Sequence, residues 1–222
     1  MRYAKDPSKK KWEVESMMNR VEILGIQIDN VSWEEALLRV RDMIRSESSH
    51  QIVTPAIEQI VLARRDPEFR RVLKDADYVA ENGTPLVFAS RWHKTPLQAR
   101  ITGVDLVPAI CRIASEENAS VFLLGGDEGV AEEAAQKLQE QIPGLRIAGT
   151  YFPPFGFEKN PEEAEKAIRM VQQAAPKVVF VALGCPKQEK WIHRNKERLG
   201  ASLLIGIGGA FNMISGREKR AP

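Results

Sequence analysis

Short apolar runs rich in valine and isoleucine alternate along the chain with longer segments whose apolar positions recur at helical spacing. The alternation begins near Val21 and continues without an internal repeat or a low-complexity tract. Such alternation is typical of βα units, in which helices join parallel strands. The sequence therefore predicts a doubly wound α/β fold, with a mainly parallel, Rossmann-like sheet of about six strands and helices on both faces.

Local start signals place the individual elements. Ser32 and Glu35 have the spacing of a capping box, which predicts a helix over 33–44. Pro55 opens a helix that we expect to continue to Leu73. Further helices are expected from about 85, over 105–117, up to 141, over 161–174 and over 186–198. Strands are expected at 21–28, 51–54, 78–80, 121–124, 146–149, 178–183 and 203–207.

Composition narrows the class of protein. The chain has 222 residues, with 32 Lys+Arg against 30 Asp+Glu, so it has no strong basic field and we expect no nucleic-acid partner. Cys111 and Cys185 are expected to be reduced thiols. No apolar run approaches the ~20 residues that span a bilayer, and the start lacks the apolar stretch of a signal peptide. We expect a basic arm over 1–20 and one α/β domain over 21–222.

Ligands of open α/β sheets bind beyond the carboxyl ends of the strands, so the residues there are the candidates for chemistry. The glycines that follow the strand at 121–124 suit either a tight turn or a backbone approach to a phosphate. Their spacing differs from that of a dinucleotide fingerprint or a P-loop, which argues against a dehydrogenase. The candidate positions are Thr54; Asn82 and Gly83; Gly125, Gly126 and Gly129; Gly184 to Gln188; and Gly206, Gly208 and Gly209.

A metal site has little support in the sequence. His50, His93 and His193 are isolated, and no Cys or His pair has the spacing of metal ligands. Asp75 and Asp77 form an Asp-x-Asp pair, but the pair precedes a strand and belongs at the opposite end of the sheet. We therefore expect no bound metal and no cofactor.

Several segments, taken in order, closely resemble the WecG/TagA/CpsF family of bacterial glycosyltransferases. The resemblance covers about residues 21–222, and several ordered motifs together are far more specific than any one of them. The matching segments are VTP (53–55), LARRDP (62–67), RITGVDL (100–106), VFLLGG (121–126), PPFG (153–156), LG (183–184), PKQEKW (186–191) and IGIGGAF (205–211).

The resemblance implies an inverting, metal-independent transfer of N-acetylmannosamine or a related sugar from a UDP donor. The implied acceptor is a polyprenyl-diphosphate-linked sugar at the cytoplasmic membrane face, in cell-envelope polysaccharide or teichoic acid assembly. Such a reaction needs a proton acceptor and positive groups for the leaving UDP. The family pattern assigns catalysis to Thr54, Arg100 and the position of Asn82, and we expect the donor to be bound by Gly125, Gly126, Lys187, Gln188, Gly208 and Gly209.

Two positions depart from the family pattern. The family usually has an asparagine where this chain has Ala56, and an aspartate, the proposed base, where this chain has Asn82. A neutral amide cannot accept the proton. Either another group such as Glu81 or Asp105 serves, or the substrate differs, or the chain is an impaired UDP-sugar-binding relative.

Family members usually continue beyond residues 219–222 with a basic, amphipathic appendage that docks on the membrane and completes the active site. We expect this chain, as a shortened or a naturally short form, to lack that tail. Through the tail the full-length form is expected to sit peripherally at the inner face of the cell membrane. Apolar surface left uncovered without it favours a homo-oligomer.

Overall fold

The computed structural model describes residues 19–90 and 96–219. Six parallel strands form one sheet in the order β4-β3-β8-β7-β5-β6. The inner strands are almost entirely buried, which explains the apolar runs of β5, β7 and β8, while β3 begins with the buried polar residues His50 and Gln51. The strands are β3 (His50–Val53), β4 (Tyr78–Val79), β5 (Ser120–Gly125), β6 (Arg146–Tyr151), β7 (Val178–Ala182) and β8 (Leu203–Gly206).

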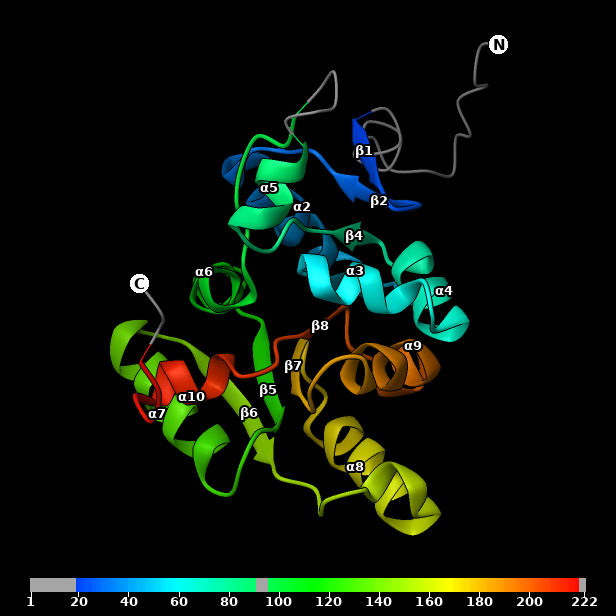
Figure 1. The fold of residues 1–222 in the computed structure, drawn as a ribbon. Helices are drawn as coiled ribbons and strands as arrows, with labels where there is room; N and C mark the ends of the chain where they lie inside the picture. The colour runs from blue at the N-terminus through cyan, green and yellow to red at the C-terminus, as the bar shows by residue number, and fades with distance from the viewer. Residues whose placement is uncertain (1–18, 91–95, 220–222) are drawn as a thin grey trace.

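Helices cover both faces of the sheet (Figure 1), so the predicted doubly wound architecture is confirmed. Successive side chains of β7 face opposite cores: Val178 and Phe180 on one side, Val179 and Val181 on the other. The first face is covered by α2 (Trp33–Arg45), α6 (Gly103–Glu116), α7 (Val130–Gln141) and α10 (Ala210–Ser215). The second is covered by α3 (Ile57–Ala63), α4 (Pro67–Asp75), α8 (Pro161–Ala174) and α9 (Lys187–Leu199).

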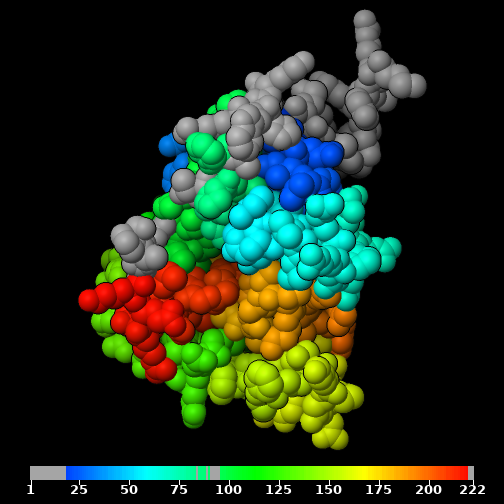
Figure 2. All heavy atoms as spheres, in the orientation of Figure 1, coloured from blue at the N-terminus to red at the C-terminus, as the bar shows by residue number. Residues whose placement is uncertain are grey.

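On this second face α9 packs between α4 and α8, and Figure 2 shows its orange segment between the cyan α3–α4 segment and yellow α8. Two short elements complete the chain path. They are α5 (Thr84–Ser90), after β4, and the 3-10 helix η1 (Phe157–Lys159), before α8.

The opening segment differs from the prediction. Instead of one strand over 21–28, the chain forms an antiparallel hairpin of β1 (Arg20–Ile23) and β2 (Ile26–Asp29), apart from the main sheet. Leu24 and Gly25 have φ of 52° and 80°, the positive values of a two-residue hairpin turn. A Leu-Gly pair is a weak turn signal, so the apolar pattern looked continuous. The arm expected over 1–20 lies outside the described residues, apart from positions 19 and 20.

The helix expected from Pro55 to Leu73 is two helices. Asp66 caps α4, accepting a hydrogen bond from the Phe69 N–H at 3.0 Å, and Pro67 occupies the first turn. A residue before proline avoids the helical conformation, so the chain breaks at Asp66. The short helix α10, which packs against α7 and α6, was not predicted, because its six residues are too few for a recognisable period.

A buried carboxylate ties the hairpin to the rest of the fold. Asp29 has no exposed surface, and its Oδ2 accepts a hydrogen bond from the Val79 N–H at 2.9 Å. Its Oδ1 accepts from Arg39 Nη1 at 3.0 Å and from Arg20 Nε at 3.2 Å. One side chain thus joins β1, β2, α2 and β4.

Candidate active site

Two adjoining pockets lie at the carboxyl edge of the sheet. The larger, about 360 Å³, is formed by the exits of β5, β7 and β8 and by the loop after β6. The smaller, about 200 Å³, is formed by the exits of β3, β4 and β8 and the starts of α6 and α9. Gly208 and Gly209 line both pockets. The larger pocket sits where β5 leads outward to β6 while its neighbour β7 leads back to β8, which is a topological switch point.

The glycines after β5 have a structural reason. A Cβ on Gly125 would lie 2.3 Å from the Ala182 carbonyl oxygen, and the Gly126 N–H donates to that oxygen at 2.7 Å. Both glycines line the larger pocket, yet the Gly126 N–H is already used inside the protein. The two glycines therefore have a structural role, because they shape the pocket wall by letting β5 and β7 approach closely.

Gly208 and Gly209 differ from that pair. A Cβ on either would meet no atom within 4 Å, so a side chain there would project into open space. The Gly208 N–H donates to Gln188 Oε1 at 3.1 Å. Because neither glycine has a side chain, no side-chain atom of theirs separates the two pockets that they both line.

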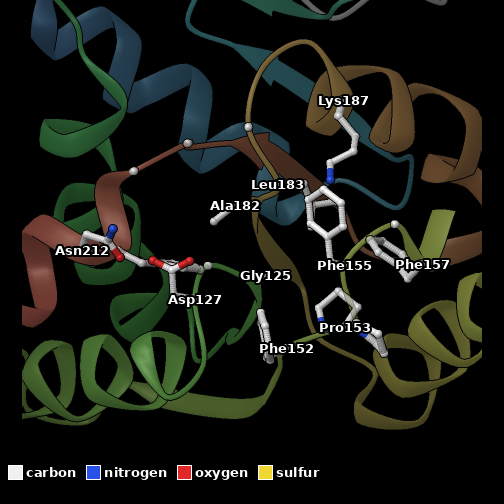
Figure 3. Close-up of a pocket in the computed structure, with 17 residues that line it drawn as sticks. Gly125, Asp127, Phe152, Pro153, Phe155, Phe157, Ala182, Leu183, Lys187 and Asn212 are labelled. Carbon is white, nitrogen blue, oxygen red and sulfur yellow. The ribbon is translucent and has the colours of Figure 1, made fainter.

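A cation and an aromatic ring stand at one side of the larger pocket. Lys187 Nζ lies 5.5 Å from the centre of the Phe155 ring and 3.9 Å from Glu158. Asp127 and Asn212 lie across the pocket from this pair, as Figure 3 shows. The pocket thus has a positive, aromatic side and a polar, acidic side.

The smaller pocket brings Thr54 and Asn82 together. Asn82 Nδ2 donates to the Thr54 carbonyl oxygen at 3.0 Å, which links the exits of β3 and β4. Both residues line the pocket, as the sequence predicts for residues after neighbouring strands. This hydrogen bond holds the two strand exits together, and the amide, being neutral and non-basic, takes no proton.

Gln188 lines the smaller pocket and is hydrogen-bonded to residues that line the larger one. Its side chain is buried, and its Oε1 accepts hydrogen bonds from the N–H groups of Leu183 (3.3 Å) and Gly208 (3.1 Å). Its Nε2 donates to Glu189 Oε1 at 2.7 Å. The side chain fixes the exits of β7 and β8 relative to each other.

Glu189 is a site residue that the sequence reasoning missed. It lines the smaller pocket and is 5% exposed, and its carboxyl interacts with the Gln188 amide and with the Cys185 thiol. Burial raises the pKa of its carboxyl, and the hydrogen bond from Gln188 opposes that rise. Its position in the sequence could have revealed it, because Glu189 directly follows Gln188 in the first turn of the helix that comes after a buried strand.

Three expected residues stay out of both pockets. Arg100 is exposed and does not line either one. Glu81 has no exposed surface, and burial raises the pKa of its carboxyl to about 8. Asp105 accepts a hydrogen bond from Thr102 Oγ1 at 2.7 Å, at the start of α6. Neither carboxyl expected to stand in at position 82 lines a pocket in this structure.

The acidic pair at 75–77 lies at the opposite edge of the sheet, as the sequence predicts. Asp77 accepts a hydrogen bond at 2.8 Å from the N–H of Gln51, near the start of β3, and pairs with Lys196 and with His50. His93 falls outside the described residues. Within residues 19–90 and 96–219 no group of three or more His, Cys, Asp or Glu side chains is placed to hold a metal ion. Cys111 and Cys185 are free thiols, as predicted.

An open parallel α/β sheet with a pocket at its switch point is the architecture of enzymes that bind nucleotides at the carboxyl edge. Residues 21–222 match the Glycosyl transferase WecG/TagA/CpsF family, and the chain belongs to it. It is therefore a glycosyltransferase. Similar proteins include the N-acetylglucosaminyldiphosphoundecaprenol N-acetyl-beta-D-mannosaminyltransferases of Staphylococcus aureus strains NCTC 8325 / PS 47 and COL. Each is 30% identical over 212 residues, covering 95% of this chain and 81% of the relative.

Proposed function

We propose that this chain transfers N-acetylmannosamine from UDP to N-acetylglucosaminyldiphosphoundecaprenol, with inversion and without a metal ion. The observation that carries the proposal is the pair of adjoining pockets that meet at Gly208 and Gly209. A transfer reaction needs two substrates whose reacting atoms meet. Two pockets that adjoin at glycines without side chains suit that need. The activity named for the Staphylococcus aureus relatives supports the choice of sugar and acceptor.

The proposal assigns the larger pocket to the donor. Lys187 supplies positive charge for the diphosphate that leaves with uridine, a role that a metal ion fills in other enzymes. Gly125 and Gly126 form part of the pocket wall, and Gln188 holds Leu183 and Gly208, which also line this pocket, in place. Transfer that persists in excess EDTA is the expected outcome.

The smaller pocket is assigned to the acceptor sugar, with Thr54 and Asn82 along its side. Of the described residues that line this pocket, Glu189 is the one that carries a carboxyl group. We assign it the role of proton acceptor, because it lines this pocket and burial raises the pKa of its carboxyl, which makes it a stronger base than an exposed glutamate. Arg100 stays in the proposal as a phosphate contact from outside the pockets.

The proposed acceptor is a membrane lipid, so the reaction takes place at the cytoplasmic face of the membrane with the protein bound peripherally. In the part of the chain that the structure describes, no helix is both long enough and apolar enough to cross a bilayer.

The test supplies UDP-N-acetylmannosamine and a detergent-solubilised lipid acceptor, and detects the disaccharide lipid by mass spectrometry with and without EDTA. Calorimetric titration with UDP runs in parallel. Product formation with and without EDTA supports the full proposal. The absence of both product and UDP binding at millimolar concentration refutes it.

A second candidate function is a UDP-sugar-binding protein without transferase activity, favoured by the Asn82 amide at the position of the family's aspartate. Asn82→Asp decides between the two, because a carboxylate at this site is ionised at neutral pH and accepts a proton. We expect Glu189→Gln to abolish transfer, and the double variant Glu189→Gln/Asn82→Asp to regain part of it. If the unsubstituted protein binds UDP, forms no product and gains no activity from Asn82→Asp, the binding protein is the better description.

A further inference from the structure

Phe155 is the most exposed large apolar side chain among the described residues, at 101% of its reference surface. It sits second in a tight turn that the Phe157 N–H closes by donating to the Pro154 carbonyl at 3.0 Å. Gly156 occupies the third position with φ of 76°, which favours glycine. The turn therefore holds the Phe155 ring outward by its backbone geometry.

The loop that carries this ring is anchored on both sides. Phe157 is 2% exposed, and its ring centre lies 6.0 Å from that of Trp191 in an edge-on arrangement. Pro153 and Pro154 fix the backbone φ ahead of the turn. Because the anchors are rigid, Phe155 loses little conformational freedom when a flat partner packs on it.

The ring stands at the edge of the larger pocket beside the Lys187 ammonium group, 5.5 Å from the ring centre. Figure 3 shows Phe155 and Lys187 together on one side, facing Asp127 and Asn212 across the pocket. A nucleoside diphosphate has a flat, apolar base face joined to an anionic diphosphate. An exposed aromatic ring next to a cation matches both parts of such a molecule.

We infer that Phe155 is the stacking platform for the nucleobase of the donor, with Lys187 beside it on the diphosphate. This inference rests on the proposed function, which places the donor in the larger pocket. Stacking on an aromatic ring tolerates every base because each base has a π-face. Phe155 therefore strengthens binding of nucleoside diphosphates in general, and selection of uracil falls to other groups.

The test is calorimetric titration of the whole chain with UDP, CDP, ADP and inorganic pyrophosphate. The variants are Phe155→Ala, Phe155→Trp and the matched control Phe88→Ala. Phe88 is also an exposed phenylalanine, at 56%, but it lies on α5 and lines neither pocket. Thermal unfolding of each variant checks the fold, and we expect little change because both side chains are exposed.

We expect Phe155→Ala to weaken UDP binding about tenfold, Phe155→Trp to restore it, and Phe88→Ala to leave it unchanged. Pyrophosphate has no base, so its affinity should be the same in all variants. The uracil H5 and H6 proton resonances should shift upfield on binding, and Phe155→Ala should remove that shift. UDP affinity within twofold of the unsubstituted protein in Phe155→Ala, or an equal loss for pyrophosphate, overturns the inference.

Failure of the proposed function gives a different result. If UDP does not bind while CDP or ADP binds with a tenfold dependence on Phe155, the UDP donor is wrong and the stacking role stands. If UDP binds equally well with and without the Phe155 ring, the donor assignment stands and the stacking role falls. If no nucleoside diphosphate binds to the unsubstituted protein, both are refuted.

Discussion

Replacing Gly209 by alanine separates the function of the site from the stability of the fold. Gly209 has φ of −75° and ψ of 10°, which alanine adopts without strain, and a Cβ there meets no atom within 4 Å. Removing a glycine stabilises by about 0.4–1 kcal/mol through the unfolded chain. Alanine is a poorer N-cap than glycine for α10, which opposes that gain. The free energy of unfolding should therefore change by less than about 1 kcal/mol.

The added methyl group, however, projects from the wall that both pockets share. A methyl group placed where a substrate must pack costs about 1–3 kcal/mol, which corresponds to a loss of roughly 5-fold to 150-fold in kcat/KM. The assay is the transfer reaction with varied donor and acceptor, together with titration by UDP and a thermal unfolding curve.

Gly125→Ala is the control with the opposite outcome. Its Cβ would lie 2.3 Å from the Ala182 carbonyl oxygen, at a φ of 94°, so the protein should lose stability by several kcal/mol. Unchanged kinetics in Gly209→Ala would show that the substrates do not meet at this wall. A large loss of stability in Gly209→Ala would show that the space beside it is not open.

Two further predictions concern buried carboxyls. The pKa of Glu81 is raised by burial from 4.5 to about 8, so between these values the folded chain keeps a proton that the unfolded chain has lost. This group therefore makes the free energy of unfolding fall as the pH rises through that window, by about 1.4 kcal/mol per pH unit. Glu81→Gln should flatten denaturant midpoints measured from pH 5 to pH 8, and a curve parallel to that of the unsubstituted protein would contradict this account. Asp29→Ala should remove the buried carboxylate that accepts hydrogen bonds from Arg39 and from the Val79 N–H, and should lower the free energy of unfolding by about 3–5 kcal/mol in urea denaturation. A loss below about 1 kcal/mol would mean that solvent replaces the carboxylate.

The order and type of most elements follow from local sequence. The apolar runs at 121–124 and 178–183 predict β5 and β7 because strands buried on both faces leave no polar alternation. The capping box at Ser32 and Glu35 fixes the start of α2, and both of its hydrogen bonds form. The prediction was wrong in two places: it gave one strand where β1 and β2 form a hairpin, and one helix where the chain breaks at Asp66. Each feature depends on a turn whose residues give a weaker signal than the apolar pattern around them.

For the site, the local pattern of strands and helices predicts which residues follow strands, and therefore that Thr54, Asn82 and Lys187 share one edge of the sheet. The roles of the neighbouring residues depend on how the chain folds in three dimensions. In the folded chain the Gly126 N–H and the Gln188 side-chain oxygen are hydrogen-bonded to other groups of the protein. Glu81 is buried outside both pockets, and Glu189 lines the smaller one. Hydrogen-bond partners, burial and the empty space of a pocket depend on groups that come from distant parts of the chain. They therefore cannot be predicted from local sequence.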